Sequence, residues 1–335
     1  MSTVDVISHN AEAWDLHVKN AWQWTVPVSH EEIEAARAGL FSILLTAKKP
    51  VPREWFPEEL AGLKILCLAS GGGQQAPILA AAGADVTVFD NSLAQLTQDR
   101  LVSQRENLPL KIVWGDMRDL SAFADGAFDL VFCPVSVTYI PQVQPVFDEA
   151  YRVLRKGGSF LFGATNPFVY IFDGPDWDQN RFTVSNHLPF CSLDELSPEE
   201  VSRVLQNKET IQYSHTLESL IGGQTAAGFA ITGFYEDVAH LHQIGGDVLL
   251  DGAAGAAGGG EAVDKGHLFV QLAAGDGLHG LLIVAVGGGH LRQGDVYKRQ
   301  SQEMVLGSPQ ARPAMMVWRS PSTMRGAPSP ARAPR

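Results

Sequence analysis

A glycine-rich turn and an aspartate further along the chain are the residues whose types and spacing could bind a nucleoside. Gly71, Gly72 and Gly73 follow an apolar run and precede a helix-forming run, and Asp90 ends the next apolar run, 17 residues after Gly73. Glycines let a ligand approach the backbone closely, and the start of a helix presents free N–H groups. A carboxylate at the end of the second strand can accept hydrogen bonds from two ribose hydroxyls. The combination predicts a nucleoside site; a tight turn and a helix-capping aspartate are the purely structural alternative.

These residues need a sheet to hold them, and the apolar runs predict one. Strands are expected at Lys64–Ala69, Asp85–Asp90, Lys111–Trp114, Phe128–Pro134, Ser159–Gly163 and Phe229–Tyr235. Helices are expected at Gln75–Ala82, Ser92–Glu106 and Gln144–Leu154. Strands separated by helix-sized spans imply right-handed crossovers and a parallel sheet that is covered on both faces. The predicted fold class is therefore α/β and Rossmann-like, with a helical N-terminal cap over residues 1–62.

The nucleoside unit alone does not identify the cofactor. Gly71-x-Gly73-x-x-Ala76 also satisfies the dinucleotide-binding pattern G-x-G-x-x-G/A. From the residues, an NAD(P)-dependent oxidoreductase and a non-catalytic nucleoside-binding module therefore stay open as alternatives. The oxidoreductase interpretation lacks an evident Tyr-x-x-x-Lys or comparable pair for hydride transfer.

Motifs further along the chain narrow the choice. Gly115-Asp116-Met117 follows the third predicted strand, Phe128-Asp129-Leu130-Val131 begins the fourth, and Arg152-Val153-Leu154 with Lys156-Gly157-Gly158 precedes the fifth. In this order, over roughly Leu63–Asp237, the motifs resemble the class I S-adenosylmethionine-dependent methyltransferases, and an uncharacterised bacterial branch among them. Two positions depart from the family pattern: Cys67 stands where the family usually has an acid, and Ala69 replaces the first glycine.

The resemblance implies S-adenosylmethionine (SAM) as the cofactor and assigns residues to each of its parts. The methionine part would contact the backbone of Ala69, Ser70, Gly71, Gly72 and Gly73. Asp90 with Asn91 would take the ribose, and Asp116 with Met117 would hold the adenine. The floor beneath the reactive methyl group would be lined by Pro134, Val135 and Ser136, at the end of the fourth strand.

No catalytic base is evident from the sequence. Methyl transfer is an in-line displacement, so alignment and a dry pocket can supply much of the rate, and an acceptor hydroxyl or amine can also need a base. The weak candidates for that base are His17, Tyr139, His187 and His215, although a lone His or Tyr more often has a packing or surface role. The polar and aromatic segment Gly174–Leu188 and the N-terminal helices are expected to cover the acceptor.

Charge and cysteine content restrict the partners. Up to Val238 the chain has 30 acidic and 16 basic residues, a net charge of −14, so it is poorly suited to hold a phosphate backbone. We therefore expect a small-molecule methyl acceptor and no nucleic acid. Cys67, Cys133 and Cys191 lack metal-ligand spacing, which predicts no metal site and fits a reducing cytoplasm. No apolar run approaches the roughly 20 residues of a membrane span, and no secretory start is visible, so a cytoplasmic protein without membrane contact is expected.

The composition changes near Val238. Residues 63–238 are expected to form the SAM-binding domain, whereas residues 239–335 hold 17 of the 33 glycines and only three of the 29 aromatic side chains. Asp295–Gln300 (DVYKRQ) also resembles translated sequencing-adapter text. We expect much of this Gly/Ala-rich, then Pro/Arg-rich tail to be disordered, or a frameshift or assembly product. The alternative is a genuine appendage in which His267–Leu272 or Leu281–Val286 supplies the antiparallel seventh strand that the resemblance implies.

Overall fold

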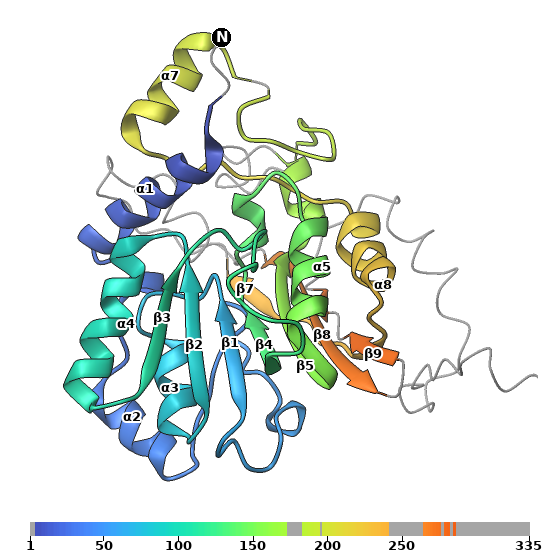
Figure 1. The fold of residues 1–335 in the computed structure, drawn as a ribbon. Helices are drawn as coiled ribbons and strands as arrows, with labels where there is room; N and C mark the ends of the chain where they lie inside the picture. The colour runs from blue at the N-terminus through green and yellow to red at the C-terminus, as the bar shows by residue number, and fades with distance from the viewer. Residues whose placement is uncertain are drawn as a thin grey trace, which may run out of the picture. The chain divides into compact units, whose positions relative to one another are not determined.

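Five parallel strands form the centre of the sheet in the computed structural model, which describes residues 4–172, 183–194, 196–240, 264–275, 278–281 and 284–285, all within the unit Met1–Gly289 (Figure 1). The strands are β1 (Lys64–Leu68), β2 (Asp85–Asp90), β3 (Leu110–Trp114), β4 (Phe128–Cys133) and β5 (Leu154–Thr165). They lie in the order β3-β2-β1-β4-β5, and each neighbouring pair is parallel. The predicted α/β fold with a parallel sheet is confirmed. Four of these strands have the predicted bounds to within one residue, whereas β5 begins at Leu154, directly after the preceding helix.

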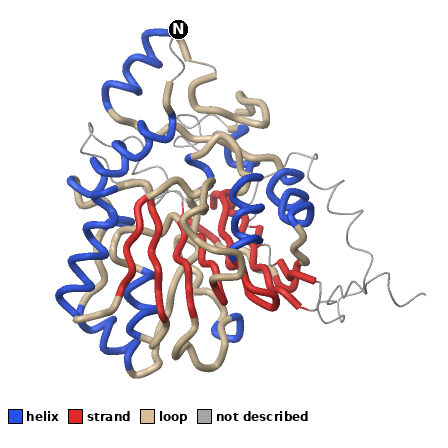
Figure 2. The backbone as a smooth tube through the Cα atoms, viewed as in Figure 1, coloured by secondary structure: helices blue, strands red, loops and turns tan. Residues whose placement is uncertain are grey.

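Helices cover both faces of this sheet (Figure 2). They are α3 (Gln75–Ala81), α4 (Leu93–Glu106) and α5 (Gln144–Val153). The side chains of β1 alternate between two cores: Ile65 and Cys67 pack with α3 and α4, whereas Leu66 and Leu68 pack with α5. All four side chains are fully buried, as expected for a strand in a parallel sheet that is covered on both sides.

The N-terminal cap contains short helices joined by extended segments. The helices are α1 (Val6–Lys19), η1 (Gln23–Thr25), α2 (His30–Arg37) and η2 (Arg53–Trp55). α2 begins at a capping box in which the side chains of Ser29 and Glu32 each accept the other's backbone N–H. Ile33 and Ala36 of this helix are fully buried in the core that α3 and α4 share, so the cap packs into the domain.

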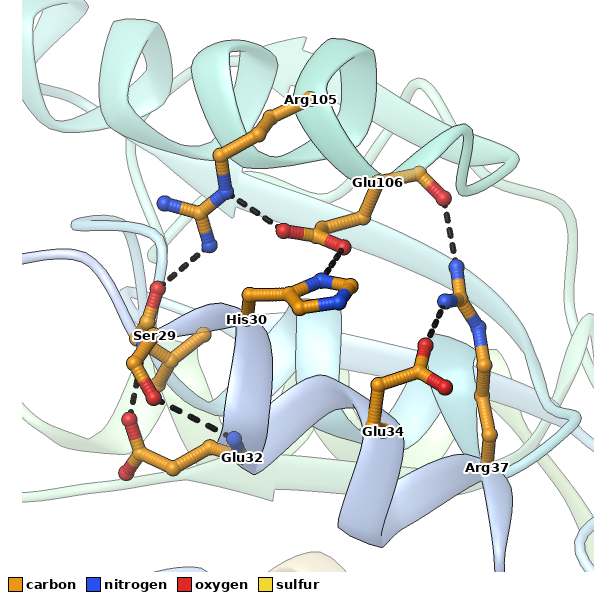
Figure 3. Close-up of polar contacts among 8 residues, drawn as sticks. Ser29, His30, Glu32, Glu34, Arg37, Arg105 and Glu106 are labelled. Carbon is orange, nitrogen blue, oxygen red and sulfur yellow. Dashed lines mark hydrogen bonds and ion pairs between the residues drawn. The ribbon is translucent and has the colours of Figure 1, made fainter.

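Polar contacts join α2 to the end of α4 (Figure 3). His30 Nδ1 lies 2.8 Å from Glu106 Oε2. Arg105 donates to the carbonyl oxygen of Val28 at 2.6 Å, and Arg37 donates to the carbonyl oxygen of Glu106 at 2.5 Å. The Glu106 side chain is only 3% exposed, so these contacts lie at the edge of the core.

Further helices follow β4 and β5 along the chain. They are η3 (Val137–Tyr139), η4 (Pro167–Ile171), α7 (Pro198–Asn207), η5 (Glu218–Gly222) and α8 (Gly223–Ala227). Parallel strands end at one edge of a sheet, where ligands bind in open α/β folds. η3 and η4 therefore lie at the same edge as the glycine turn, because they follow β4 and β5.

Strands from the C-terminal part extend the sheet beyond β5. They are β6 (Ile231–Gly233), β7 (Val238–His240), β8 (Asp264–Gly275), β9 (Leu278–Leu281) and β10 (Val284–Ala285). β8 is antiparallel to β5, with Ser159 opposite Ala273 and Thr165 opposite His267. β6 is antiparallel to β8 and is shorter than the predicted strand, because Phe229 and Tyr235 lie outside it.

The antiparallel strand β8 bears on the interpretation of the tail. It includes His267–Leu272, one of the two segments considered as a source of a seventh strand. Most other residues of 239–335 lie outside the described part of the chain. The expectation that the tail as a whole is disordered, or a frameshift or assembly product, therefore stays a prediction, as does the division into residues 1–62, 63–238 and 239–335.

Candidate active site

The glycine turn joins the end of β1 to α3. Gly72 and Gly73 have φ angles of +105° and +70°, in the left-handed region where a side chain is strained. A Cβ atom on Gly71 would lie 2.7 Å from Gln95 Cβ and 3.0 Å from Asp90 Oδ2. The turn therefore needs glycine for its backbone conformation and for its close packing against α4, whether or not a ligand approaches it.

Asp90 ends β2 and holds both the turn and the start of α4. Its Oδ2 accepts the N–H of Gly71 at 2.9 Å, and its Oδ1 accepts the N–H of Ser92, also at 2.9 Å. The side chain is largely buried, and this burial raises its pKa. Asp90 therefore does hold the tight turn and the start of the next helix, as the structural alternative for this residue predicts. Each carboxylate oxygen can still accept a further hydrogen bond, so this role is compatible with ribose binding.

The residues predicted to hold ribose and adenine lie beside Asp90. The N–H of Gly115 donates to the carbonyl oxygen of Asp90 at 3.0 Å, which fixes the start of the Gly115-Asp116-Met117 segment. The indole N–H of Trp114 donates to the backbone carbonyl oxygen of Asn91 at 2.9 Å. Asp116 forms an ion pair with Arg118, with 2.6 Å between Oδ2 and Nη2. An adenine at this place would therefore share Asp116 with a guanidinium group, which the sequence analysis did not anticipate.

The end of β4 lies next to the turn because β1 pairs with both β2 and β4. Ser136 folds back here, and its hydroxyl donates to the carbonyl oxygen of Pro134 at 2.9 Å. Val135 donates its N–H to the carbonyl oxygen of Leu45 in the cap at 3.3 Å. All the predicted cofactor segments, Ala69–Gly73, Asp90–Asn91, Asp116–Met117 and Pro134–Ser136, thus gather at one edge of the sheet.

The N-terminal cap lies directly on the glycine turn. Gln74 Nε2 donates to the carbonyl oxygens of Gln23 and Val26, both at 3.0 Å. The N–H of Val28 donates to the carbonyl oxygen of Gly73, also at 3.0 Å. These contacts hold the segment from η1 to Val28 against the glycine turn, whose backbone is predicted to contact the cofactor.

Helix α1 connects the turn region to the segments beyond β4. Asp15 Oδ1 accepts the hydroxyl of Ser92 at 2.6 Å and the N–H of Ala94 at 3.0 Å, at the start of α4. Asn10, one turn and a half earlier on the same helix, donates to the carbonyl oxygens of Tyr139 and Ile211 at 2.8 and 2.9 Å. One helix therefore bridges the ends of β2 and β4. The sequence predicts a helical cap but does not single out Asn10 or Asp15.

Two of the four base candidates meet in an aromatic cluster of Trp14, His17, Trp22 and Tyr139. Trp14 contacts Tyr139 edge-on with 5.3 Å between ring centroids, and it contacts His17 at the same separation. Trp22 lies 5.1 Å from Trp14 and 4.4 Å from His17. Packing thus explains these residue types, and the cluster also places apolar surface between α1 and the end of β4.

The other two candidates lie outside this cluster. His215 Nε2 is 2.8 Å from the carbonyl oxygen of Val137, and burial lowers its pKa, so the ring is neutral at pH 7. It also lines a cavity of about 650 Å³ between the Pro141–Gln144 loop and two segments near residues 190 and 215. His187 lies in the 183–190 segment, where Ser185 donates to the carbonyl oxygen of Ile171 at 3.0 Å. Of the predicted acceptor cover Gly174–Leu188, residues 174–182 lie outside the described part of the chain.

Asp99 is a buried site residue that the sequence analysis missed. It lies on α4, is 0% exposed, and its Oδ2 accepts the N–H of Gly72 at 3.0 Å. Burial raises its pKa well above the usual range. A carboxylate thus reaches the turn from α4, while Cys67 on β1 is buried in the place of the family's acid. The available signal was helical spacing, because Gln95, Asp99 and Val102 share one buried face of α4.

The side chains of Asp90 and Asp116 supply hydrogen-bond acceptors of the kind that the ribose and adenine of a nucleoside cofactor need. The turn is so close to α4 that a Cβ on Gly72 would meet Gln95 Oε1 at 3.0 Å and the carbonyl oxygen of Trp24 at 3.1 Å. The buried side chains of Asp90 and Asp99 accept the N–H groups of Gly71 and Gly72. Among the described residues, no group of three His, Cys, Asp or Glu side chains is arranged to hold a metal ion. Within the same residues, no helix combines the length and apolar character that crossing a membrane requires.

Known proteins with similar sequences agree on one family. Residues 66–162 match the family model described as a methyltransferase domain. The chain is 46% identical over 232 residues to the uncharacterized methyltransferase YbaJ of Bacillus subtilis (strain 168), an alignment covering 69% of this chain and 91% of that protein. It is 30% identical over 129 residues to the ubiquinone biosynthesis O-methyltransferase of Acinetobacter baumannii (strain AYE), covering 37% of this chain and 54% of that protein.

Solved structures give a weaker likeness. An S-adenosylmethionine dependent methyltransferase from Mesorhizobium loti is 20% identical, with a TM-score of 0.41, over 56% of this chain and 81% of that one. The assignment rests on the sequence relatives, above all on the 46% identity over nearly the whole Bacillus protein. By that relationship, the matching domain model and the order of its motifs, the chain belongs to the class I S-adenosylmethionine-dependent methyltransferases.

Proposed function

We propose that this methyltransferase binds SAM over the Ala69–Gly73 turn and transfers the methyl group to a small-molecule acceptor. The observation that carries the proposal is that Asp90 holds the glycine turn while one helix, α1, joins the ends of β2 and β4 beside it. SAM, when bound, supplies an electrophilic methyl group on a sulfonium ion. The chain's own task is to orient that group and to exclude water.

Each part of the site has a role in this proposal. The turn backbone and Asp90 hold the methionine and ribose parts, with Asn91 beside the ribose. Asp116 and Met117 flank the adenine, and the Pro134–Ser136 backbone forms the floor below the methyl group. The aromatic cluster of Trp14, His17, Trp22 and Tyr139 packs over this edge and keeps it dry, which favours alignment of donor and acceptor.

The cavity beside η3 is the proposed acceptor site. Its volume of about 650 Å³ is within the range of small-molecule pockets. It begins at Pro141, five residues after Ser136, and His215 connects it to η3 through the carbonyl oxygen of Val137. The net charge of −14 up to Val238 also disfavours nucleic acid as the acceptor.

His215 is the proposed base where the acceptor needs one. It alone of the four candidates lines the described walls of this cavity. Its lowered pKa keeps the ring neutral near pH 7, and a neutral imidazole can accept a proton. His17 and Tyr139 are proposed to shape the pocket through their ring contacts, and His187 is given no catalytic role.

The proposal is tested with SAM that carries an isotopically labelled methyl group. The protein is incubated with this SAM and a fractionated pool of small metabolites, and mass spectrometry identifies any molecule that gains one labelled methyl group. We expect label in a small molecule, and slower labelling by His215→Gln than by the control His187→Gln. Label found only in RNA, DNA or protein fractions would contradict a small-molecule acceptor.

A further inference from the structure

Two buried carboxylates bind successive N–H groups of the glycine turn. Asp90 accepts from Gly71 at 2.9 Å, and Asp99 accepts from Gly72 at 3.0 Å. Asp90 is 9% exposed and Asp99 is 0% exposed. The two side chains come from different elements, β2 and α4, and they meet at the turn that the proposed cofactor would contact.

Two buried acceptor atoms beside the glycine turn have no hydrogen-bond donor among the described residues. Asp99 Oδ1 and Gln95 Oε1 are both buried and have no hydrogen-bond partner in the described structure. The two residues are one turn apart on α4 and both face Gly72. Buried acceptors are seldom left unpaired, because desolvation without a hydrogen bond is costly. A carboxylic acid proton on Asp99, donated to Gln95 Oε1, satisfies both atoms at once.

Burial and neighbouring charge favour such a proton, whereas the backbone N–H groups of Gly72 and Gly73 favour the carboxylate, and the net effect is a raised pKa of Asp99. The charged groups that act on the pair are carboxylates: Asp90 faces Asp99, and Asp15 of α1 faces Asp90. Cys67 on β1 also faces Asp99, and burial raises the pKa of its thiol, so it stays neutral. Among the residues that the structure describes, no Lys or Arg side chain forms a hydrogen bond or ion pair with Asp90 or Asp99. Two uncompensated buried charges this close are unfavourable.

We propose that the cofactor site without ligand holds a proton on Asp99, and that binding of the positively charged SAM releases this proton to solvent. The product S-adenosylhomocysteine (SAH) lacks the sulfonium charge, and it leaves the proton in place. The inference rests on the proposed cofactor site. Its consequence is that rising pH favours SAM over SAH, so the pair of acids discriminates between fresh cofactor and spent product by charge.

The test is calorimetric binding of SAM and SAH to the full chain in two buffers of different ionisation enthalpy. The difference in heat between buffers counts the protons released by each ligand. Both ligands carry the same amino and carboxyl groups, so the difference between them isolates the sulfonium charge. We expect SAM to release more protons than SAH, and the dissociation constant of SAM to fall by up to about tenfold per pH unit relative to that of SAH.

Two variants locate the proton. In Asp99→Asn, the amide accepts from Gly72 with its oxygen and donates to Gln95 Oε1 with its nitrogen, so it imitates the neutral acid. The difference between SAM and SAH should vanish in this variant. It should persist in the control Asp129→Asn, whose carboxylate binds the N–H of Lys64 at the opposite edge of the sheet.

Equal proton counts for SAM and SAH in the parent protein would overturn the inference, and would mean that the Gln95 amide donates to an ionised Asp99 instead. A difference that survives in Asp99→Asn would overturn it as well, since the proton would then lie elsewhere. Failure of the parent protein to bind either ligand would count against the proposed cofactor site itself.

Discussion

Asn10 and Ile211 exchange two hydrogen bonds although 201 residues separate them along the chain. The side-chain amide of Asn10 donates to the carbonyl oxygen of Ile211 at 2.9 Å, and the N–H of Ile211 donates to Asn10 Oδ1 at 2.8 Å. The same amide donates to the carbonyl oxygen of Tyr139 at 2.8 Å. Asn10 thereby joins α1, the turn after β4 and the strand-like segment before the proposed acceptor pocket.

Replacing Asn10 by alanine should destabilise the protein strongly. Asn10 is only 2% exposed, so its loss removes the partners of the buried N–H and C=O groups of Ile211 and one partner of the part-buried Tyr139 carbonyl. We expect a loss of about 2–4 kcal/mol in unfolding free energy, because buried unpaired groups cost about 1–3 kcal/mol each and partial relaxation offsets some of this. Urea unfolding measures the loss. Asn20→Ala, at the exposed end of the same helix, is the control and should change stability by less than about 0.5 kcal/mol. Equal stability of the two variants would contradict the role of Asn10.

Gly71→Ala should be costly for a steric reason. Its new Cβ would lie 2.7 Å from Gln95 Cβ, so either the turn or α4 must shift. Such overpacking typically costs about 1–3 kcal/mol, and thermal unfolding should show a lower Tm. Gly222→Ala is the control, because the nearest atom to its new Cβ is 3.8 Å away. A Gly71→Ala protein that is as stable as the Gly222→Ala protein would show that the turn is looser than described.

The His30–Glu106 contact should stabilise the protein only at lower pH. The hydrogen bond that His30 donates to the Glu106 carboxylate raises the pKa of His30 above its ordinary value. The contribution is therefore fully present below the pKa of an unfolded His, about 6.5, and is lost as the pH rises through the higher folded value. The difference in Tm between the parent and His30→Gln should be larger at about pH 5.5 than at about pH 8. The same pH dependence in a Glu106→Gln background would contradict the pairing.

Much of the fold could be predicted from the sequence, because the strands are short, mainly apolar runs separated by helix-sized spans. β1 to β4 follow this pattern and were predicted to within one residue. Asn10, Asp15 and Asp99 could not be recognised in the same way. A polar side chain in a helix normally predicts solvent exposure, and these three are polar groups paired with backbone that is distant along the chain or lies across a turn.

Only part of the candidate site can be predicted from the sequence, for a related reason. Motif order identified the turn, Asp90 and the segments after β3 and β4, since those residues follow strands directly. The pairing of Asp116 with Arg118 and the contact of the cap with Gln74 depend on tertiary packing, which local spacing does not report. The predicted sixth strand is too long because local apolar character does not reveal that β8 pairs with only part of it.

Strand β8 makes a prediction about the tail. Its backbone pairs with β5, with Val270 opposite Phe162 and Leu272 opposite Phe160. Amide hydrogens of residues 268–272 should therefore exchange slowly, on the scale of those in β4, which serves as the internal reference. Mass spectrometry of peptic fragments measures this exchange. Fast exchange throughout residues 239–335 would contradict the pairing and support a disordered or artefactual tail.

Binding of SAM to the parent protein and to Asp90→Ala, measured by isothermal titration calorimetry beside NAD, tests the central claim most directly. The parent should bind SAM and not NAD. Removing the Asp90 carboxylate should weaken SAM binding by about 1.5–3 kcal/mol, or roughly 10- to 150-fold, because charge-assisted hydrogen bonds to the ribose are lost and the N–H groups of Gly71 and Ser92 lose their acceptor. Asp129→Asn, at the other edge of the sheet, should bind SAM like the parent. Tight SAM binding by Asp90→Ala, or a parent protein that prefers NAD, would contradict the account.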